Sequence, residues 1–151
     1  MIIYEKRDRL FGNIYPDLTE NEIGAALVKQ IRRLGLAEKC PAIISVFKEL
    51  WESKFWRYTG YDGASIVTDV SHPAIWNFIH DWMYRTGMGG LESDVIYREL
   101  MILGGISKVK AYRRYYVIRV AWLLYFKHKH KKSGNVRDLS DNCVLLYNSL
   151  K

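Results

Sequence analysis

The chain has 151 residues, of which 49% are hydrophobic and 26% are charged, and its formal net charge is +7 at pH 7. This length predicts one globular domain that buries about two thirds of its unfolded surface. Its two cysteines exclude a disulfide framework and are expected to be buried, reduced thiols. The longest apolar run, residues 120–126, is far shorter than a membrane span. The positive charge predicts an anionic partner: nucleic acid phosphates, anionic lipid or an acidic protein surface.

Two helices are expected in the N-terminal part of the chain. Thr19 and Glu22 have the spacing of a capping box, and an apolar stripe follows them as far as Gly35. A second helix is expected to begin near Pro41 and to carry an apolar face through Trp51. The stretch that follows has the chemistry of a turn.

The middle of the chain is expected to form an antiparallel helix pair. The third helix is expected from Ser71, which is a good N-cap residue, through Tyr84. The glycine-rich turn at residues 87–90 closes it, and a fourth helix is expected from near Glu92 to Gly104. The turn is short enough for the fourth helix to fold back along the third.

The longest helix is expected from Ser107 to about His130, before a short C-terminal helix capped by Ser140. The expected core stripe of the long helix is Val109, Tyr112, Tyr116, Ile118, Val120, Leu123 and Leu124. The apolar face expected for the last helix is Leu145, Leu146 and Leu150. The sequence therefore predicts a mainly α protein, a single compact helical domain of five to six helices. Its parts would be an N-terminal helical part (1–55), a motif-bearing core (56–130) and a C-terminal helix (138–150).

Ionisable side chains gather near the end of the third expected helix. His80 and Tyr84 share one helical face, while Asp81 points about 100° away. The following turn is expected to bring Asp94, in the first turn of the next helix, within reach of His80. A carboxylate that accepts from one imidazole nitrogen fixes the tautomer and leaves the other nitrogen as a general base. The alternative is a polar network that orders the core without doing chemistry.

The turn at residues 58–65 reads Y-T-G-Y-D-G-A-S and precedes these residues. Calcium takes carboxylate and backbone carbonyl oxygens, so this turn and Asp81 together predict a calcium site. The alternative is a plain turn, in which Asp62 bonds its own backbone and Gly63 supplies a positive φ. The sequence leaves both interpretations open.

The motifs D-G-A-S (62–65) and H-D-x-x-Y, followed by an aspartate before an apolar helix, resemble a family of unknown function found in phages and prophages. The resemblance covers roughly residues 56–120. The family usually has isoleucine or valine and then a proline after this motif. This chain has Ile66 but carries Val67 in place of the proline. The resemblance implies a phage or prophage origin.

H-D-x-x-Y also resembles the catalytic helix of phospholipases A2, including the phospholipase domain of parvovirus capsid proteins. The resemblance implies that His80 activates a water, Asp81 binds calcium and Asp94 orients His80. It also implies carbonyl ligands from an upstream tyrosine- and glycine-rich loop, here Tyr61 and Gly63, with Tyr84, Tyr58, Asp62 and Ser65 in support. The chain departs from secreted phospholipases at Trp82 and Met83, which lie where those enzymes place cysteines, and at Ser65, where the loop usually has glycine.

A basic segment accompanies the longest expected helix. Its cations are Lys108, Lys110, Arg113 and Arg114 near the beginning and Lys127, Lys129, Lys131 and Lys132 near the end. Such a segment is expected to bind nucleic acid phosphates or an anionic membrane face. The alternative is a solvated helix end, where cations complement the helix dipole.

Two functions from different classes follow. The first is a phage or prophage hydrolase that cleaves an ester, such as a phospholipid, with calcium and the His80–Asp94 pair. The second is a non-enzymatic virion, assembly or host-interaction protein in which the same cluster is structural. A phosphoesterase using a divalent metal, Asp62, His80 and Asp94 ranks last, because further carboxylates would be expected. No signal peptide is visible, so the expected location is the host cytoplasm or the virion.

Overall fold

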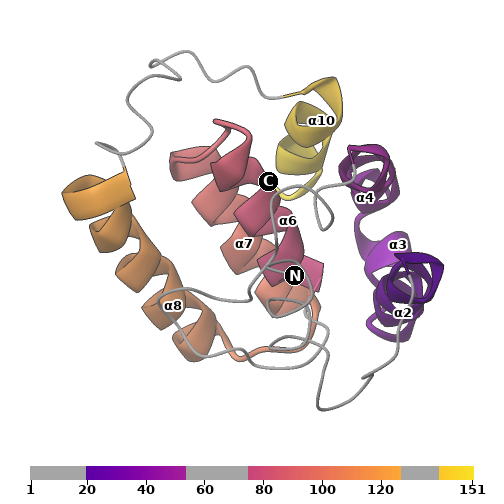
Figure 1. Ribbon diagram of the computed structural model, residues 1–151. Coiled ribbons are helices and arrows are strands. Elements are labelled where there is room, and N and C mark those ends of the chain that lie inside the picture. The colour runs from indigo at the N-terminus through magenta and orange to yellow at the C-terminus, as the bar shows by residue number, and fades with distance from the viewer. Residues whose placement is uncertain (1–19, 54–74, 127–139) are drawn as a thin grey trace.

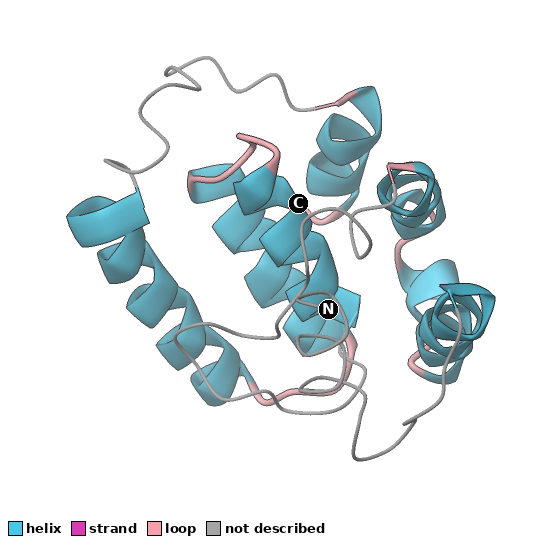
Figure 2. Ribbon diagram, viewed as in Figure 1, coloured by secondary structure: helices cyan, strands magenta, loops and turns pink. Residues whose placement is uncertain are grey.

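The computed structural model describes residues 20–53, 75–126 and 140–151 (Figure 1). Within these residues the chain forms seven α-helices and one π-helical turn and no strand (Figure 2). The expected mainly α, compact helical fold is confirmed. Among the described residues, no helix has both the length and the apolar character needed to cross a bilayer.

The N-terminal helices are α2 (Glu20–Arg33), α3 (Leu36–Lys39) and α4 (Ala42–Glu52). Gly35 follows α2 with a φ of 63°, a left-handed conformation that glycine adopts without strain. The expected end of the first helix is therefore confirmed. The short helix α3 was not predicted, because four residues are too few to show an apolar period.

Helices α6 (Ile75–Arg85) and α7 (Leu91–Leu103) form the centre of the molecule (Figure 1). A Cβ atom at Gly104, just after α7, would come within 2.5 Å of the Trp76 ring near the start of α6. At the opposite end, Asp94 near the start of α7 accepts a hydrogen bond from Tyr84 near the end of α6. The two helices therefore run antiparallel, as expected.

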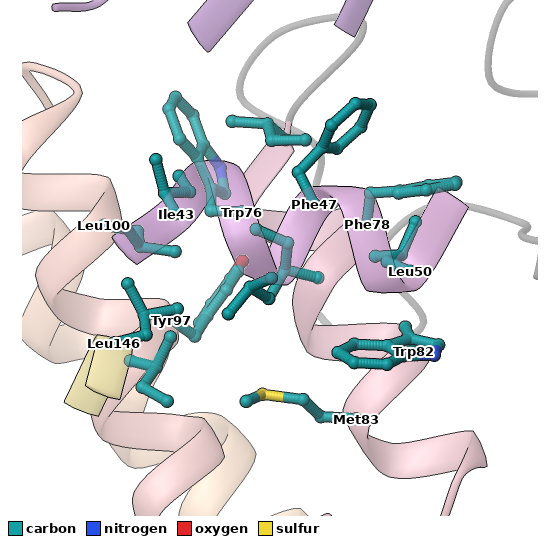
Figure 3. Close-up of a cluster of buried hydrophobic side chains, with 14 of the residues drawn as sticks. Ile43, Phe47, Leu50, Trp76, Phe78, Trp82, Met83, Tyr97, Leu100 and Leu146 are labelled. Atoms are coloured by element: carbon teal, nitrogen blue, oxygen red, sulfur yellow. The ribbon is translucent and has the colours of Figure 1, made fainter. Parts of the chain in front are cut away.

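The remaining helices pack on this pair. Helix α8 (Lys108–Ala121) packs against α7 on one side, while α2, α3 and α4 lie on the other side (Figure 1). Helix α10 (Asp141–Ser149) packs against α4 and α7. Apolar side chains from α4, α6, α7 and α10 meet between these helices to form a core (Figure 3), which includes Ile43, Phe47, Leu50, Trp76, Phe78, Trp82, Met83, Tyr97, Leu100 and Leu146.

The expected core stripe of the longest helix is wrong. Of its members only Ile118 is buried, and Val109, Tyr112, Tyr116, Val120, Leu123 and Leu124 are exposed. Helix α8 instead turns Ala111, Arg114 and Ile118 inward. The physical reason is the cluster described below, in which an arginine of α8 meets a buried carboxylate of α7. After α8 the chain forms a π-helical turn (Trp122–Phe126), and the expected continuation to His130 lies outside the described residues.

The C-terminal helix begins as predicted. The side-chain oxygen of Ser140 accepts a hydrogen bond from the backbone nitrogen of Cys143, at 3.3 Å. Leu146 is buried and Leu150 is partly buried, but Leu145 is 58% exposed, so its assignment to the apolar face is wrong. Both cysteines are free and buried, as expected.

Candidate active site

Asp94 lies in the first turn of α7, at the point where the chain leaves the glycine turn. Its backbone nitrogen donates to the Gly90 carbonyl at 3.1 Å, and the Gly90 nitrogen donates to the Ser93 hydroxyl at 2.9 Å. These bonds fix the first turn of the helix and therefore the direction of the Asp94 side chain. The carboxylate is fully buried, and it lies near the positive end of the α7 dipole, which favours a negative charge.

Three donors surround the Asp94 carboxylate. Its Oδ1 atom accepts from the Tyr84 hydroxyl at 2.5 Å and lies 2.8 Å from Nε2 of His80. Its Oδ2 atom accepts from Nη1 of Arg119 at 2.8 Å. The donors come from two helices, α6 and α8, so the carboxylate ties both to α7. A buried carboxylate is stable only when such donors replace its lost hydration.

The hydrogen bond to Asp94 determines the tautomer of His80. A carboxylate can only accept, so Nε2 carries the shared proton and Nδ1 of the neutral ring keeps its lone pair. The ring lies 4.4 Å from the Tyr84 ring and 4.7 Å from the Tyr97 ring, measured between centroids. The His80 side chain is 13% exposed, whereas Asp94 has no exposure. His80 is therefore a held imidazole with a basic nitrogen, beside a buried carboxylate.

The Tyr84 ring is itself covered by an aromatic side chain. The Trp122 ring, at the start of the π-helical turn, meets the Tyr84 ring edge-on at a centroid distance of 5.5 Å. A Cβ atom at Gly89 would come within 3.1 Å of both rings, so the turn passes close to this cover. The cover closes the cluster on the side where α8 ends.

The structure brings together part of the predicted site. The contact of His80 with Asp94 is present as expected, and Tyr84 adds a hydrogen bond to the same carboxylate. Asp81 is half-buried, one position after His80 on α6. The expected loop residues Tyr58, Tyr61, Asp62, Gly63 and Ser65 lie outside the described residues.

Arg119 was not predicted as part of this site. It lies 25 residues after Asp94, and no local spacing relates the two residues. The signal in the sequence was a second stripe on the same helix, in which Ala111, Ile118 and Trp122 recur at helical spacing with arginines among them. This stripe is less apolar than the one on the opposite face, so an apolar pattern alone selects the wrong side.

The expected calcium site has one carboxylate in the described residues. Both oxygens of Asp94 are engaged by protein donors, and Asp81 lies one position after His80 on α6. In the described residues, no group of three or more histidine, cysteine or acidic side chains is placed to hold a metal. These residues by themselves do not fit calcium.

The basic patch differs from the expectation at one position. Lys108, Lys110 and Arg113 are exposed, but Arg114 is only 8% exposed and lies on the inner side of α8. Arg114 therefore does not belong to a surface patch. The other expected members, Lys127, Lys129, Lys131 and Lys132, fall outside the described residues.

Comparisons of the chain with models of protein families, with curated proteins and with solved structures found no match. The assignment of a function therefore depends on the geometry around Asp94.

Proposed function

We propose that this protein is a hydrolase of phage or prophage origin that cleaves a carboxylic ester, with His80 as general base and Asp94 as its orienting carboxylate. The observation that carries the proposal is the 2.8 Å contact between Nε2 of His80 and Oδ1 of Asp94. This contact leaves Nδ1 with its lone pair. The cluster is largely buried, and the His80 side chain retains some exposure to water. A base needs this combination of a fixed tautomer and access to water.

The proposed reaction uses the two nitrogens of His80 differently. Nδ1 takes a proton from a water molecule, and the resulting hydroxide adds to the ester carbonyl. When the tetrahedral intermediate collapses, the imidazolium returns the proton to the leaving alkoxide. Asp94 stabilises the imidazolium through Nε2, while Tyr84 and Arg119 hold the carboxylate in position.

The substrate class and the calcium requirement rest on the phospholipase A2 resemblance. A phospholipid ester suits a protein with a net charge of +7, which attracts anionic lipid. Asp81 would supply a carboxylate ligand for calcium, and Tyr61 and Gly63 would add carbonyl oxygens. Saturable calcium binding by the parent that is lost in Asp81→Asn, measured by titration calorimetry, would support this part of the proposal.

The catalytic role of His80 is tested by two matched variants. His80→Gln and Tyr84→Phe each remove one side chain that donates to the same oxygen of Asp94, so both disturb the network. Only His80→Gln removes a base. We expect fatty-acid release from phosphatidylglycerol vesicles, with calcium present, to fall about 100-fold or more in His80→Gln. Tyr84→Phe loosens the hold on Asp94 but keeps the base, so it should lower the activity far less than His80→Gln does. Equal activity of His80→Gln and the parent would contradict the proposal.

A second candidate function is a non-enzymatic phage protein, used in the virion, in assembly or in contact with the host. It is favoured by the ion pair of Arg119 with Asp94, which satisfies the buried carboxylate and joins α7 to α8. In this case neither His80→Gln nor Tyr84→Phe changes fatty-acid release, while both lower the thermal unfolding midpoint. Calcium then has no effect on the midpoint of the parent.

A further inference from the structure

The outer face of α8, together with the π-helical turn, is apolar although it lies at the surface. Its large side chains are between 38% and 82% exposed and lie along one side of the helix: Val109, Tyr112, Tyr116, Val117, Val120, Leu123 and Leu124. A contiguous apolar surface of this kind is uncommon on a protein that meets only water and usually marks an interaction site.

This outer face carries positive charge, and α8 and the π-helical turn contribute no acidic side chain to it. Lys108, Lys110 and Arg113 are exposed near the start of α8. No aspartate or glutamate occurs between Glu99 and Asp138, a stretch that contains the whole helix and the π-helical turn. The surface is therefore an apolar stripe with cations at one end.

The inner face keeps this stripe turned outward. Arg119 is bonded to the buried carboxylate of Asp94, and Ala111 and Ile118 pack inward. If α8 rotated to bury its apolar side, Asp94 would lose its charged partner while remaining buried. Removing one partner of a buried ion pair is strongly destabilising. The helix therefore cannot bury the apolar stripe by rotating.

We propose that the outer face of α8 binds the surface of an anionic lipid bilayer, with the helix lying parallel to the membrane. Aliphatic side chains would enter the acyl boundary, the tyrosines would lie at headgroup level, and the cations would meet lipid phosphates. A second copy of the chain is a less suitable occupant. A two-fold interface places the same surface on both partners, so Lys108, Lys110 and Arg113 would meet no acidic side chain of the partner's α8 across it.

An anionic bilayer as partner rests on the proposed function and extends it. The bilayer would place lipid esters against α8, whose inner side contacts Asp94 of α7. The inference concerns binding, however, and binding is measured without hydrolysis. Failure of the vesicle experiment below and failure of the His80→Gln experiment are therefore separate results.

The experiment compares two leucines of nearly equal exposure on different helices. Leu123 on the outer face is 53% exposed, and Leu145 on α10 is 58% exposed. The full chain and the variants Leu123→Asp and Leu145→Asp are incubated with vesicles of phosphatidylglycerol and phosphatidylcholine in equal amounts, and binding is measured by co-sedimentation. Vesicles of phosphatidylcholine alone are the control for charge. Circular dichroism verifies that both variants are folded.

The parent and Leu145→Asp should bind the anionic vesicles equally. The affinity of Leu123→Asp for these vesicles should be lower by a factor of about ten or more. Phosphatidylcholine vesicles should bind all three proteins weakly. The comparison of Leu123→Asp with Leu145→Asp is needed because cations elsewhere in the chain also attract anionic lipid. Binding by the parent alone therefore does not show that the outer face of α8 is the contact.

Three results would overturn the inference. The first is equal binding of the two variants, and the second is no binding by the parent. The third is a parent dimer in solution that Leu123→Asp dissociates and Leu145→Asp does not, since the outer face would then belong to a second copy.

Discussion

At the scale of single residues, the cluster around Asp94 combines one predicted contact with one that sequence reasoning missed. His80 and Asp94 were expected to meet, because a helical face and a short glycine turn relate them locally. Arg119 reaches the same carboxylate from a different helix, and only the packing of α8 on α7 brings it there. Local spacing predicts contacts between neighbouring elements, and it does not predict which side of a distant helix faces inward.

The ion pair of Arg119 with Asp94 should be a main contribution to stability. Arg119→Met leaves the buried carboxylate without its charged partner and should lower the free energy of unfolding by about 2–4 kcal/mol. Arg113→Met, on the exposed side of the same helix, should change it by less than about 0.5 kcal/mol. Urea unfolding of both variants measures the difference.

A double variant identifies the cause of this loss. In an Asp94→Asn background the carboxylate is already gone, so Arg119→Met should be much less destabilising there than in the parent. An equal loss in both backgrounds would mean that Arg119 stabilises the protein through packing and not through the ion pair.

Cys143 should make stability depend on pH in the alkaline range. Burial raises the pKa of its thiol to about 11 from an ordinary 9.0; the Ser140 hydrogen bond lowers this pKa and the Glu49 charge raises it. Because the pKa is raised in the native state, the contribution is complete below pH 9 and is lost as pH rises towards 11. In that window the unfolded thiol ionises and the native thiol does not, so the loss is at most about 1.4 kcal/mol per pH unit.

The Cys143→Ala variant isolates this contribution from other groups that titrate in the same range. The stability difference between the parent and Cys143→Ala should move against the parent as pH rises from 9 to 11, measured by urea unfolding at a series of pH values. A difference that stays constant over this range would contradict the prediction.

At the scale of elements, the helices with strong local signals were predicted well. Capping residues, glycine turns and apolar periods indicated α2, α4, α7 and α10, and the structure has a helix at each place. The buried side of helix α8 was predicted wrongly, because apolar residues recur at helical spacing on both of its sides. Burial of apolar area favours one side, while the need to neutralise Asp94 favours the other, and the second effect prevails. The face that was wrongly expected in the core is the one that we propose for membrane binding, so the two findings have one cause.

At the scale of the whole molecule, polar side chains connect the N-terminal helices to the central pair. Oε1 of Gln30 on α2 accepts from the backbone nitrogen of Ile75 at 2.6 Å, at the first described turn of α6. Nζ of Lys39 on α3 donates to the Leu103 carbonyl at 2.9 Å, at the end of α7. Both bonds satisfy helix termini that have no intrahelical partner. The central helices therefore depend on the N-terminal part for their ends as well as for their core.

Helix α10 completes this connection, because it packs between the two parts. Nδ2 of Asn142 donates to Oε2 of Glu49 on α4 at 3.0 Å, and the Ser149 hydroxyl lies 3.1 Å from the Cys40 thiol. Leu146, on the same helix, is fully buried in the core that α4, α6 and α7 share (Figure 3). The predicted single domain should therefore unfold as one unit, and a change in α10 should affect both parts.

Leu146→Ala and Leu145→Ala test this cooperation with neighbouring residues of the same type. Leu146 has no exposed surface, so its truncation should lower the free energy of unfolding by about 2–4 kcal/mol. Leu145 is 58% exposed, and its truncation should change the free energy by less than about 0.5 kcal/mol. Urea unfolding followed by far-UV circular dichroism and by tryptophan fluorescence should give coincident transitions for the parent and for both variants. Two separate transitions, of which Leu146→Ala shifts only one, would show that the helices on either side of α10 unfold independently.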